Sequence, residues 1–198
     1  MKKLGLLLGT EGVLCSTARL HRQAWENVLS LNHIPFQGID GLDFTALSRE
    51  EGLDALLAFS QTELSPAEKE VLIDEKNEQY RQLLANVSRT DLLPGVAELL
   101  KALRKQDIRL CVVTRSKNAV LILCQLGLEG AFDAVCDGND RLNDARDKDL
   151  YHYAARLLGL LPRDCLVWEN SEFHRQAAKN MGFDTVCGAA EAVRSAIG

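Results

Sequence analysis

Two stretches of this chain have residue types that bind phosphate groups. Ser116-Lys117-Asn118 follows an apolar run and precedes a helical pattern. Backbone N–H groups and the dipole at the start of a helix favour an anion. The guanidinium of Arg49 suits bidentate contact with phosphate oxygens. Each stretch has a plainer alternative, because Ser116 could only cap the helix and Arg49 could be a solvated residue beside two glutamates.

A third group combines aromatic and polar side chains at helical spacing. His21 and Trp25 lie one position around from an apolar stripe, so they could line a sugar pocket or pack against that stripe. Lys76 lies in a polar helical pattern, where it could contact a substrate or be solvated. The stripe consists of Leu20, Ala24, Val28 and Leu31.

Alternating strand and helix patterns must position these residues. Apolar runs predict strands, and helical spacing predicts the segments between them. This alternation is typical of an α/β fold with a doubly wound parallel sheet that helices cover on both faces. The predicted strands are Leu4–Leu8, Arg109–Thr114, Phe132–Cys136, Cys165–Trp168 and Thr185–Cys187; the predicted helices are Val96–Lys105, Asn118–Leu126, Asp149–Leu158 and Glu172–Met181.

Residues 17–88 break this alternation with helical patterns alone. The predicted helices here are Ala18–Leu31, Leu47–Phe59 and Pro66–Val87. An all-helical insertion after the first strand is typical of a cap over the carboxyl ends of the strands, where ligands bind in such sheets. We therefore expect a core domain of residues 1–16 and 89–198 and a helical cap domain of residues 17–88.

Composition excludes several classes of protein. The chain has 198 residues, 46% of them apolar and 26% charged, with 23 Lys and Arg against 28 Asp and Glu for a net charge of −5. This apolar content and small net charge exclude dominant disorder. The acidic balance argues against a nucleic-acid partner, which requires a basic surface.

Cysteine usage and the N-terminal segment indicate the compartment. The six cysteines are scattered singly without a Cys-x-x-Cys pair, which favours a reducing cytoplasm over a disulfide framework or a zinc site. Met1–Leu8 imitates a signal peptide, but Glu11 interrupts the apolar run. No stretch approaches the roughly 20 apolar residues that span a bilayer. We expect a cytoplasmic protein that does not associate with a membrane.

Several short motifs together resemble one known family. They are His21 with Trp25, Ser48-Arg49-Glu50, Lys76-Asn77 with Tyr80, Pro94-Gly95, and Thr114 through Asn118. From its first strand to its last, the chain resembles the β-phosphoglucomutase-like subfamily of the haloacid dehalogenase superfamily. The resemblance implies a Rossmann-like core with a helical cap, phosphatase or phosphomutase chemistry, and Mg²⁺. It also implies that substrate phosphate contacts Arg49, Thr114, Ser116, Lys117 and Asn118, and that His21, Trp25 and Lys76 line the sugar pocket.

The first catalytic motif of that family is altered in this chain. The family pattern is Asp-x-Asp-Gly, in which the first aspartate attacks phosphorus and the second serves as acid and base. The resemblance aligns Gly9 with the nucleophile and Glu11 with the acid/base. Glycine has no side chain to attack with. The neighbouring Thr10 is a poor substitute, because its hydroxyl is not ionised and no base is evident beside it.

Two further motifs also depart from the family pattern. Ala145 aligns with the lysine that balances the charge of carboxylate and phosphate, and Arg146 or Lys148 would need a different path to replace it. The fourth motif, normally Glu-Asp-Ser, is Glu169-Asn170-Ser171 here. The resemblance thus implies a magnesium site formed by Glu11, Glu169 and Asn170, and the loss of a carboxylate weakens it. The sequence assigns Asp137 and Asp144 to loops.

These changes converge on one hypothesis. Substrate-side residues are retained while reaction-side residues are lost, which predicts a pseudoenzyme that binds a phosphorylated sugar without transferring its phosphoryl group. One alternative is a weak Mg²⁺-dependent phosphatase or phosphoglucomutase that uses Glu11. Another is a partner-binding protein whose pocket is vestigial. The sugar, any protein partner and the oligomeric state stay open.

Overall fold

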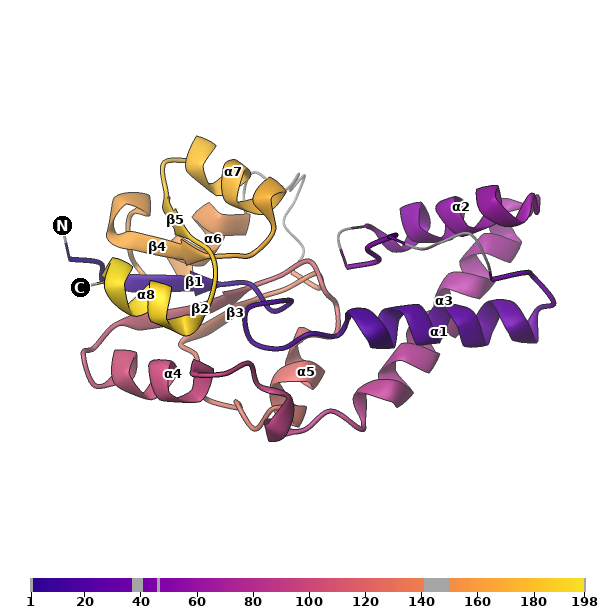
Figure 1. Ribbon diagram of the computed structural model, residues 1–198. Helices are drawn as coiled ribbons and strands as arrows, with labels where there is room; N and C mark the ends of the chain where they lie inside the picture. Colours follow the sequence, from indigo (N-terminus) through magenta and orange to yellow (C-terminus); the bar gives the residue numbers. More distant parts are fainter. Residues whose placement is uncertain (1, 37–40, 46, 141–149, 198) are drawn as a thin grey trace. The chain divides into compact units, whose positions relative to one another are not determined.

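The protein consists of two compact units. The computed structural model describes residues 2–36, 41–45, 47–140 and 150–197 (Figure 1). One unit, called the core below, comprises Met1–Ser16 and Val87–Gly198, and the other, called the cap, comprises Thr17–Asn86. Each unit has its own hydrophobic interior.

The core is built on a parallel sheet of five strands in its described part. The strand order is β3 (Ala134–Cys136), β2 (Arg109–Val113), β1 (Gly5–Leu8), β4 (Cys165–Trp168) and β5 (Asp184–Val186). In the central strand, Leu8 lies opposite Val112 of β2 and Trp168 of β4. The predicted α/β class with a parallel sheet is thus confirmed.

Helices cover both faces of this sheet, as its continuous apolar strands require. Figure 1 shows α6 (Leu150–Leu157) and α7 (Glu172–Asn180) above the sheet and α4 (Val96–Arg104) and α5 (Ala119–Gln125) below it. Helix α8 (Ala190–Ile197) packs against α4. One hydrophobic cluster joins alternate strand residues to α6 and α7; its members include Leu7, Cys111, Val167, Tyr151, Ala154 and Ala178.

The cap consists of three helices in its described part: α1 (Ala18–Leu31), α2 (Arg49–Ser60) and α3 (Pro66–Leu84). Both α2 and α3 begin with a capping box, in which a serine hydroxyl and a glutamate satisfy the first free N–H groups. Helices α1 and α3 pack against each other. The cap interior includes Trp25, Leu29, Leu53, Leu56 and Leu72.

Several element boundaries differ from the sequence prediction. Helix α3 ends at Leu84 rather than at Val87, because Ser88 adopts an extended conformation and caps a separate 3₁₀ turn, η1 (Arg89–Asp91). A second 3₁₀ turn, η2 (Pro162–Asp164), and helix α8 were not predicted. The last strand lies one residue earlier than expected, at Asp184–Val186.

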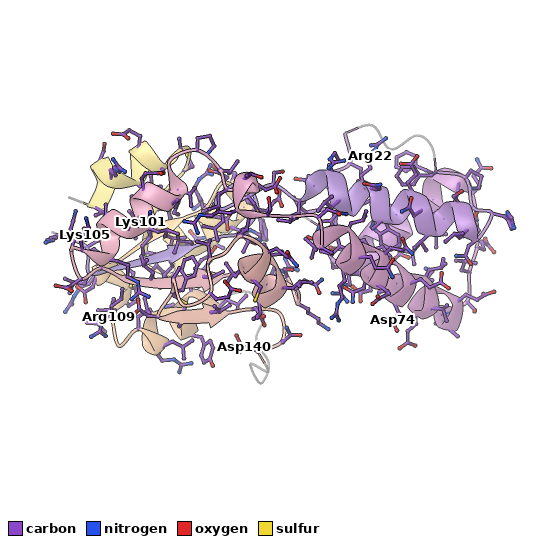
Figure 2. The ribbon with its side chains drawn as sticks, turned by 90° about the horizontal axis from the view of Figure 1, so that it is seen from below. Arg22, Asp74, Lys101, Lys105, Arg109 and Asp140 are labelled. Atoms are coloured by element: carbon purple, nitrogen blue, oxygen red, sulfur yellow. The ribbon has the colours of Figure 1, made fainter. Side chains whose placement is uncertain are left out.

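Charged side chains mark the two ends of the core sheet. Figure 2 shows Lys101, Lys105 and Arg109 at one end of the core, where β2 begins, while Asp140 follows β3 and lies away from that end. These surface cations therefore do not gather at the carboxyl ends of the strands. Within the described ranges, no helix is long and apolar enough to cross a membrane.

We expect the sheet interior to dominate the stability of the core. Leu7 is fully buried in the central strand. Leu7→Ala should lower the free energy of unfolding by about 2–5 kcal/mol, since it removes buried apolar surface and leaves a cavity. Leu157→Ala, at a residue 46% exposed, serves as the control. Urea unfolding measures both changes, and equal effects would contradict this view of the core.

Candidate functional site

The carboxyl ends of β1, β2 and β4 bring a group of core residues together. Gly9 continues β1, and its N–H donates to the Trp168 carbonyl at the end of β4 (3.0 Å). The hydroxyls of Thr10 and Thr114 lie 3.1 Å apart, which joins the ends of β1 and β2. The structure therefore places Thr10, Thr114 and Glu169 at one edge of the sheet, around Gly9.

The space above Gly9 is occupied by a carboxylate. A Cβ atom at this position would lie 2.5 Å from Oε2 of Glu169. Glu169 is only 8% exposed, and burial raises the pKa of its carboxyl group. Its Oε1 accepts a hydrogen bond from the Ser171 N–H (3.1 Å), and Nδ1 of His174 lies 3.8 Å from Oε2. The Glu169 carboxylate thus occupies the space next to Gly9, where a side chain at this position would otherwise lie.

Glu11 belongs to a tight loop after β1. Its Oε1 accepts a hydrogen bond from the Ser16 hydroxyl (2.8 Å). Within the same loop, the Gly12 N–H donates to the Cys15 carbonyl (2.8 Å). The carboxylate that the resemblance assigns as acid/base therefore has a local partner within its own loop.

Asn170 connects two loops that are distant in sequence. Its Nδ2 donates to the carbonyl of Gly12, after β1, and its Oδ1 accepts from the N–H of Gly188, after β5 (2.9 Å). The Trp168 indole N–H also donates to the Gly188 carbonyl (3.0 Å). Both polar atoms of the Asn170 amide are therefore engaged by backbone.

The predicted phosphate-binding run lies in the turn between β2 and α5. Thr114 Oγ1 accepts from the N–H of Ser116, and Ser116 Oγ accepts from the N–H of Asn118 (both 3.2 Å). Asn118, not Ser116, is the N-cap residue of α5, so the predicted cap is displaced by two residues. Lys117 is exposed, and its carbonyl accepts from Asn139 (2.9 Å). The side chains of Ser116 and Thr114 thus organise the turn itself.

Asp137 organises the neighbouring loop after β3. Its carboxylate accepts from the Asn139 N–H (2.7 Å) and from the Asn139 side-chain amide (3.2 Å), as its assignment to a loop implies. The remaining predicted positions, Asp144, Ala145, Arg146 and Lys148, lie outside the described residues.

A second cluster lies within the cap and is built around a buried lysine. Lys76 on α3 is 4% exposed, so it is not solvated. Its Nζ lies 2.8 Å from Nδ1 of His21 on α1. The ammonium also lies over the rings of Trp25 (5.4 Å) and Tyr80 (4.9 Å), where cation–π attraction favours the charge. His21 stacks on Tyr80 with centroids 4.0 Å apart.

Electrostatics connect Arg49 to this cap cluster. Burial and, to a smaller extent, the nearby charge of Arg49 together lower the pKa of Lys76 to about 7. Burial, followed by the charges of Lys76 and Arg49, lowers the pKa of His21 to about 3. His21 is therefore neutral at pH 7, and its Nδ1 can accept a hydrogen bond from Lys76. Trp25 is 2% exposed and belongs to the cap interior.

Two residues near the core group were not singled out by the sequence. His174 lies beside Glu169, and Arg175 donates to the carbonyls of Glu169 (3.1 Å) and Asn170 (2.7 Å). Both lie in the first turn of α7, where the helix dipole disfavours a cation such as the Arg175 guanidinium. An arginine at the start of a helix indicates a local anionic or carbonyl partner, and this was the available sequence signal.

The described residues do not form an obvious metal centre. No three His, Cys, Asp or Glu side chains among them gather closely enough to hold a metal ion. Mg²⁺ requires oxygen ligands and is usually anchored by one or two carboxylates. Glu11, Glu169 and Asn170 are instead each engaged by neighbouring protein groups.

The buried lysine makes a testable contribution to pH dependence. The pKa of Lys76 is about 7 in the folded chain against an ordinary value of 10.5. Between these values the unfolded state binds more protons, so the free energy of unfolding rises with pH, by up to about 1.4 kcal/mol per unit. Lys76→Met should flatten this slope in urea unfolding, whereas Lys69→Met in the same helix should retain it. A wild-type slope in Lys76→Met would contradict the assignment.

Comparison with known proteins gives a consistent relationship. Residues 10–182 match the haloacid dehalogenase-like hydrolase family. The chain is 32% identical to the β-phosphoglucomutase of Bacillus subtilis over 183 residues, covering 91% of this chain and 81% of that protein. It is 28% identical to a fructose-1-phosphate phosphatase of Escherichia coli, covering 92% and 94%. The crystal structure of a β-phosphoglucomutase from Clostridium difficile superimposes with a TM-score of 0.78 at 26% identity, covering 97% and 87%. The chain therefore belongs to the haloacid dehalogenase-like hydrolase family.

Proposed function

We propose that this protein binds a phosphorylated sugar and does not transfer its phosphoryl group. The observation that carries the proposal is the contrast between its two clusters. The cap retains a buried ammonium, Lys76, with Arg49 close enough to lower its pKa. At the end of β1, Gly9 has no side chain, and the carboxylate of Glu169 fills the space above it.

The cap cluster suits a small anion rather than a polyanion. Residues 17–86 contain 12 Asp and Glu but only 6 Lys and Arg, so the cap as a whole is acidic. A nucleic acid needs a broad basic surface. A buried lysine and one arginine within an acidic unit form a local positive site, which fits a single phosphate group. Two relatives are named for sugar-phosphate chemistry, as a phosphoglucomutase and as a fructose-1-phosphate phosphatase.

Further residues of each unit, taken separately, support this proposal. His21 offers its second ring nitrogen as a hydrogen-bond donor, since Nδ1 faces Lys76. In the core, Thr114, Ser116, Lys117 and Asn118 form the turn that the resemblance assigns to phosphate contact, and Lys117 has its side chain exposed. Trp25 supports Lys76 through its ring.

Loss of phosphoryl transfer follows from the groups at the end of β1. The family pattern places the nucleophile at position 9, and glycine cannot supply one. Thr10 is 7% exposed, and its hydroxyl faces the hydroxyl of Thr114, which is not a base. Removing a covalent nucleophile costs about 10⁶ in kcat in a well-studied hydrolase series. We further propose that Mg²⁺, which the family typically uses, binds weakly here because Asn170 provides no negative charge.

Ligand binding can be tested by thermal denaturation. Glucose 1-phosphate, glucose 6-phosphate and fructose 1-phosphate are suitable probes. A ligand at one hundred times its Kd should raise the Tm by about 5–10 °C. Arg49→Ala should abolish the shift, because it removes the charge that acts on Lys76. Arg81→Ala, at an exposed residue of α3, should retain it. The absence of any shift at millimolar ligand would reject the binding proposal and favour the partner-binding alternative.

Turnover provides a separate test. We expect no release of phosphate from sugar phosphates, acetyl phosphate or aryl phosphates above the rate of a mock purification, since no nucleophile is present at Gly9. Phosphate release is measured in the presence and absence of Mg²⁺. Activity that disappears in Glu11→Ala and Glu169→Ala would contradict this expectation and identify a weak phosphatase or mutase.

A further inference from the structure

The three residues that the resemblance assigns to a metal site, Glu11, Glu169 and Asn170, lie in loops at the carboxyl edge of the sheet. In a divalent-metal site, the ion itself joins loops and offsets carboxylate charge. Here the loops after β1, β4 and β5 are already joined by side chains, and the charge of Glu169 already has protein partners.

Asn170 joins the loops in a way that only an amide can. The Gly12 carbonyl requires a donor and the Gly188 N–H requires an acceptor, and these partners fix which way the amide points. Both glycines have positive φ angles, 67° and 95°, so the two loops have special backbone conformations where the amide contacts them. An aspartate could accept from Gly188 but would oppose the Gly12 carbonyl.

Two side chains of α7, those of His174 and Arg175, lie around Glu169. His174 Nδ1 lies 3.8 Å from the carboxylate. Arg175 donates to the carbonyls of Glu169 and Asn170 and pairs with Glu172. Its guanidinium therefore faces the backbone of both residues that would have to present ligands to a metal. Burial raises the pKa of the Glu169 carboxyl group, and the nearby charge of Arg175 opposes this rise.

Three other cations of the core lie away from this arrangement. Lys101, Lys105 and Arg109 lie at the end of the core where β2 begins, as Figure 2 shows. The guanidinium that contacts the backbone of both candidate ligands comes from Arg175 of α7, shortly after those ligands in sequence.

From these contacts we infer that the core site is independent of divalent metal: Asn170 joins the loops, and Arg175 places beside Glu169 and Asn170 a positive charge that a bound cation would otherwise supply. The site then presents a preformed edge to an anionic ligand without Mg²⁺. This inference goes beyond the proposed function, because it concerns the state of the site before any sugar phosphate binds.

The test measures the wild-type chain with metal alone. The Tm is determined in EDTA and in millimolar MgCl₂ or MnCl₂, and bound Mn²⁺ is measured by electron paramagnetic resonance. We expect no change in Tm and no bound Mn²⁺ signal. A rise in Tm with either ion, or a bound Mn²⁺ spectrum, would overturn the inference. Because no sugar phosphate is present, failure of the ligand-binding proposal does not affect this result.

Variants test the role of the amide. Asn170→Asp should lower the Tm by about 3–6 °C in EDTA, since the new carboxylate faces the Gly12 carbonyl. Asn180→Asp is the matched control, because Asn180 is exposed and its Oδ1 only accepts from Gln176 (3.0 Å), which an aspartate can also do. An unchanged Tm in Asn170→Asp would reject the bridging role. If that variant does not fold, the wild-type metal measurement still decides the main inference.

Discussion

The parallel register of β1 with β2 and β4 is the constraint on which the candidate site depends. Leu8 lies opposite both Val112 and Trp168, so the loops that follow these three neighbouring strands begin at the same level of the sheet. Every polar contact at this edge, from the paired threonine hydroxyls to the carboxylate above Gly9, follows from that alignment. A shift of register would separate these groups, because the residues that follow the three strands would no longer lie at the same level.

The core cluster and the cap cluster each bury an ionisable group, and the two groups have opposite charge. In the core, a buried carboxylate is surrounded by backbone N–H groups, an imidazole and a guanidinium. In the cap, a buried ammonium has a neutral imidazole and two aromatic rings as neighbours, and none of the ion pairs among the described residues includes it. The core carboxylate therefore has several partners within the protein, whereas the anion proposed for the cap would be the counter-charge of the ammonium.

Sequence patterns predicted the fold well because they report burial along single segments. The strands at Leu4–Leu8 and Cys165–Trp168 are uninterrupted apolar runs, and these runs indicate buried strands directly. Helix α8 was missed because its eight residues follow a short strand closely and contain mostly small side chains. The end of α3 was misplaced because the capping of η1 by Ser88 competes with continuation of the helix.

The site was harder to predict because its contacts join distant segments. The sequence identified Gly9 and Asn170 as departures from a family pattern. It could not show that Glu169 fills the space above Gly9, since that depends on a side-chain conformation. Nor could it show that Asn170 bridges Gly12 and Gly188, which lie in different loops. Lys76 was ambiguous because its helix is polar overall, and only packing against α1 buries it.

The buried amine of the cap has one more consequence. With a pKa of about 7, Lys76 carries its proton in only part of the molecules at neutral pH. A phosphate group bound beside it would stabilise the ammonium form and draw a proton from the solvent. Binding of a phosphate group in the cap would then be coupled to protonation of Lys76. The heat of binding would depend on the ionisation enthalpy of the buffer, and affinity would respond to small changes in cellular acidity.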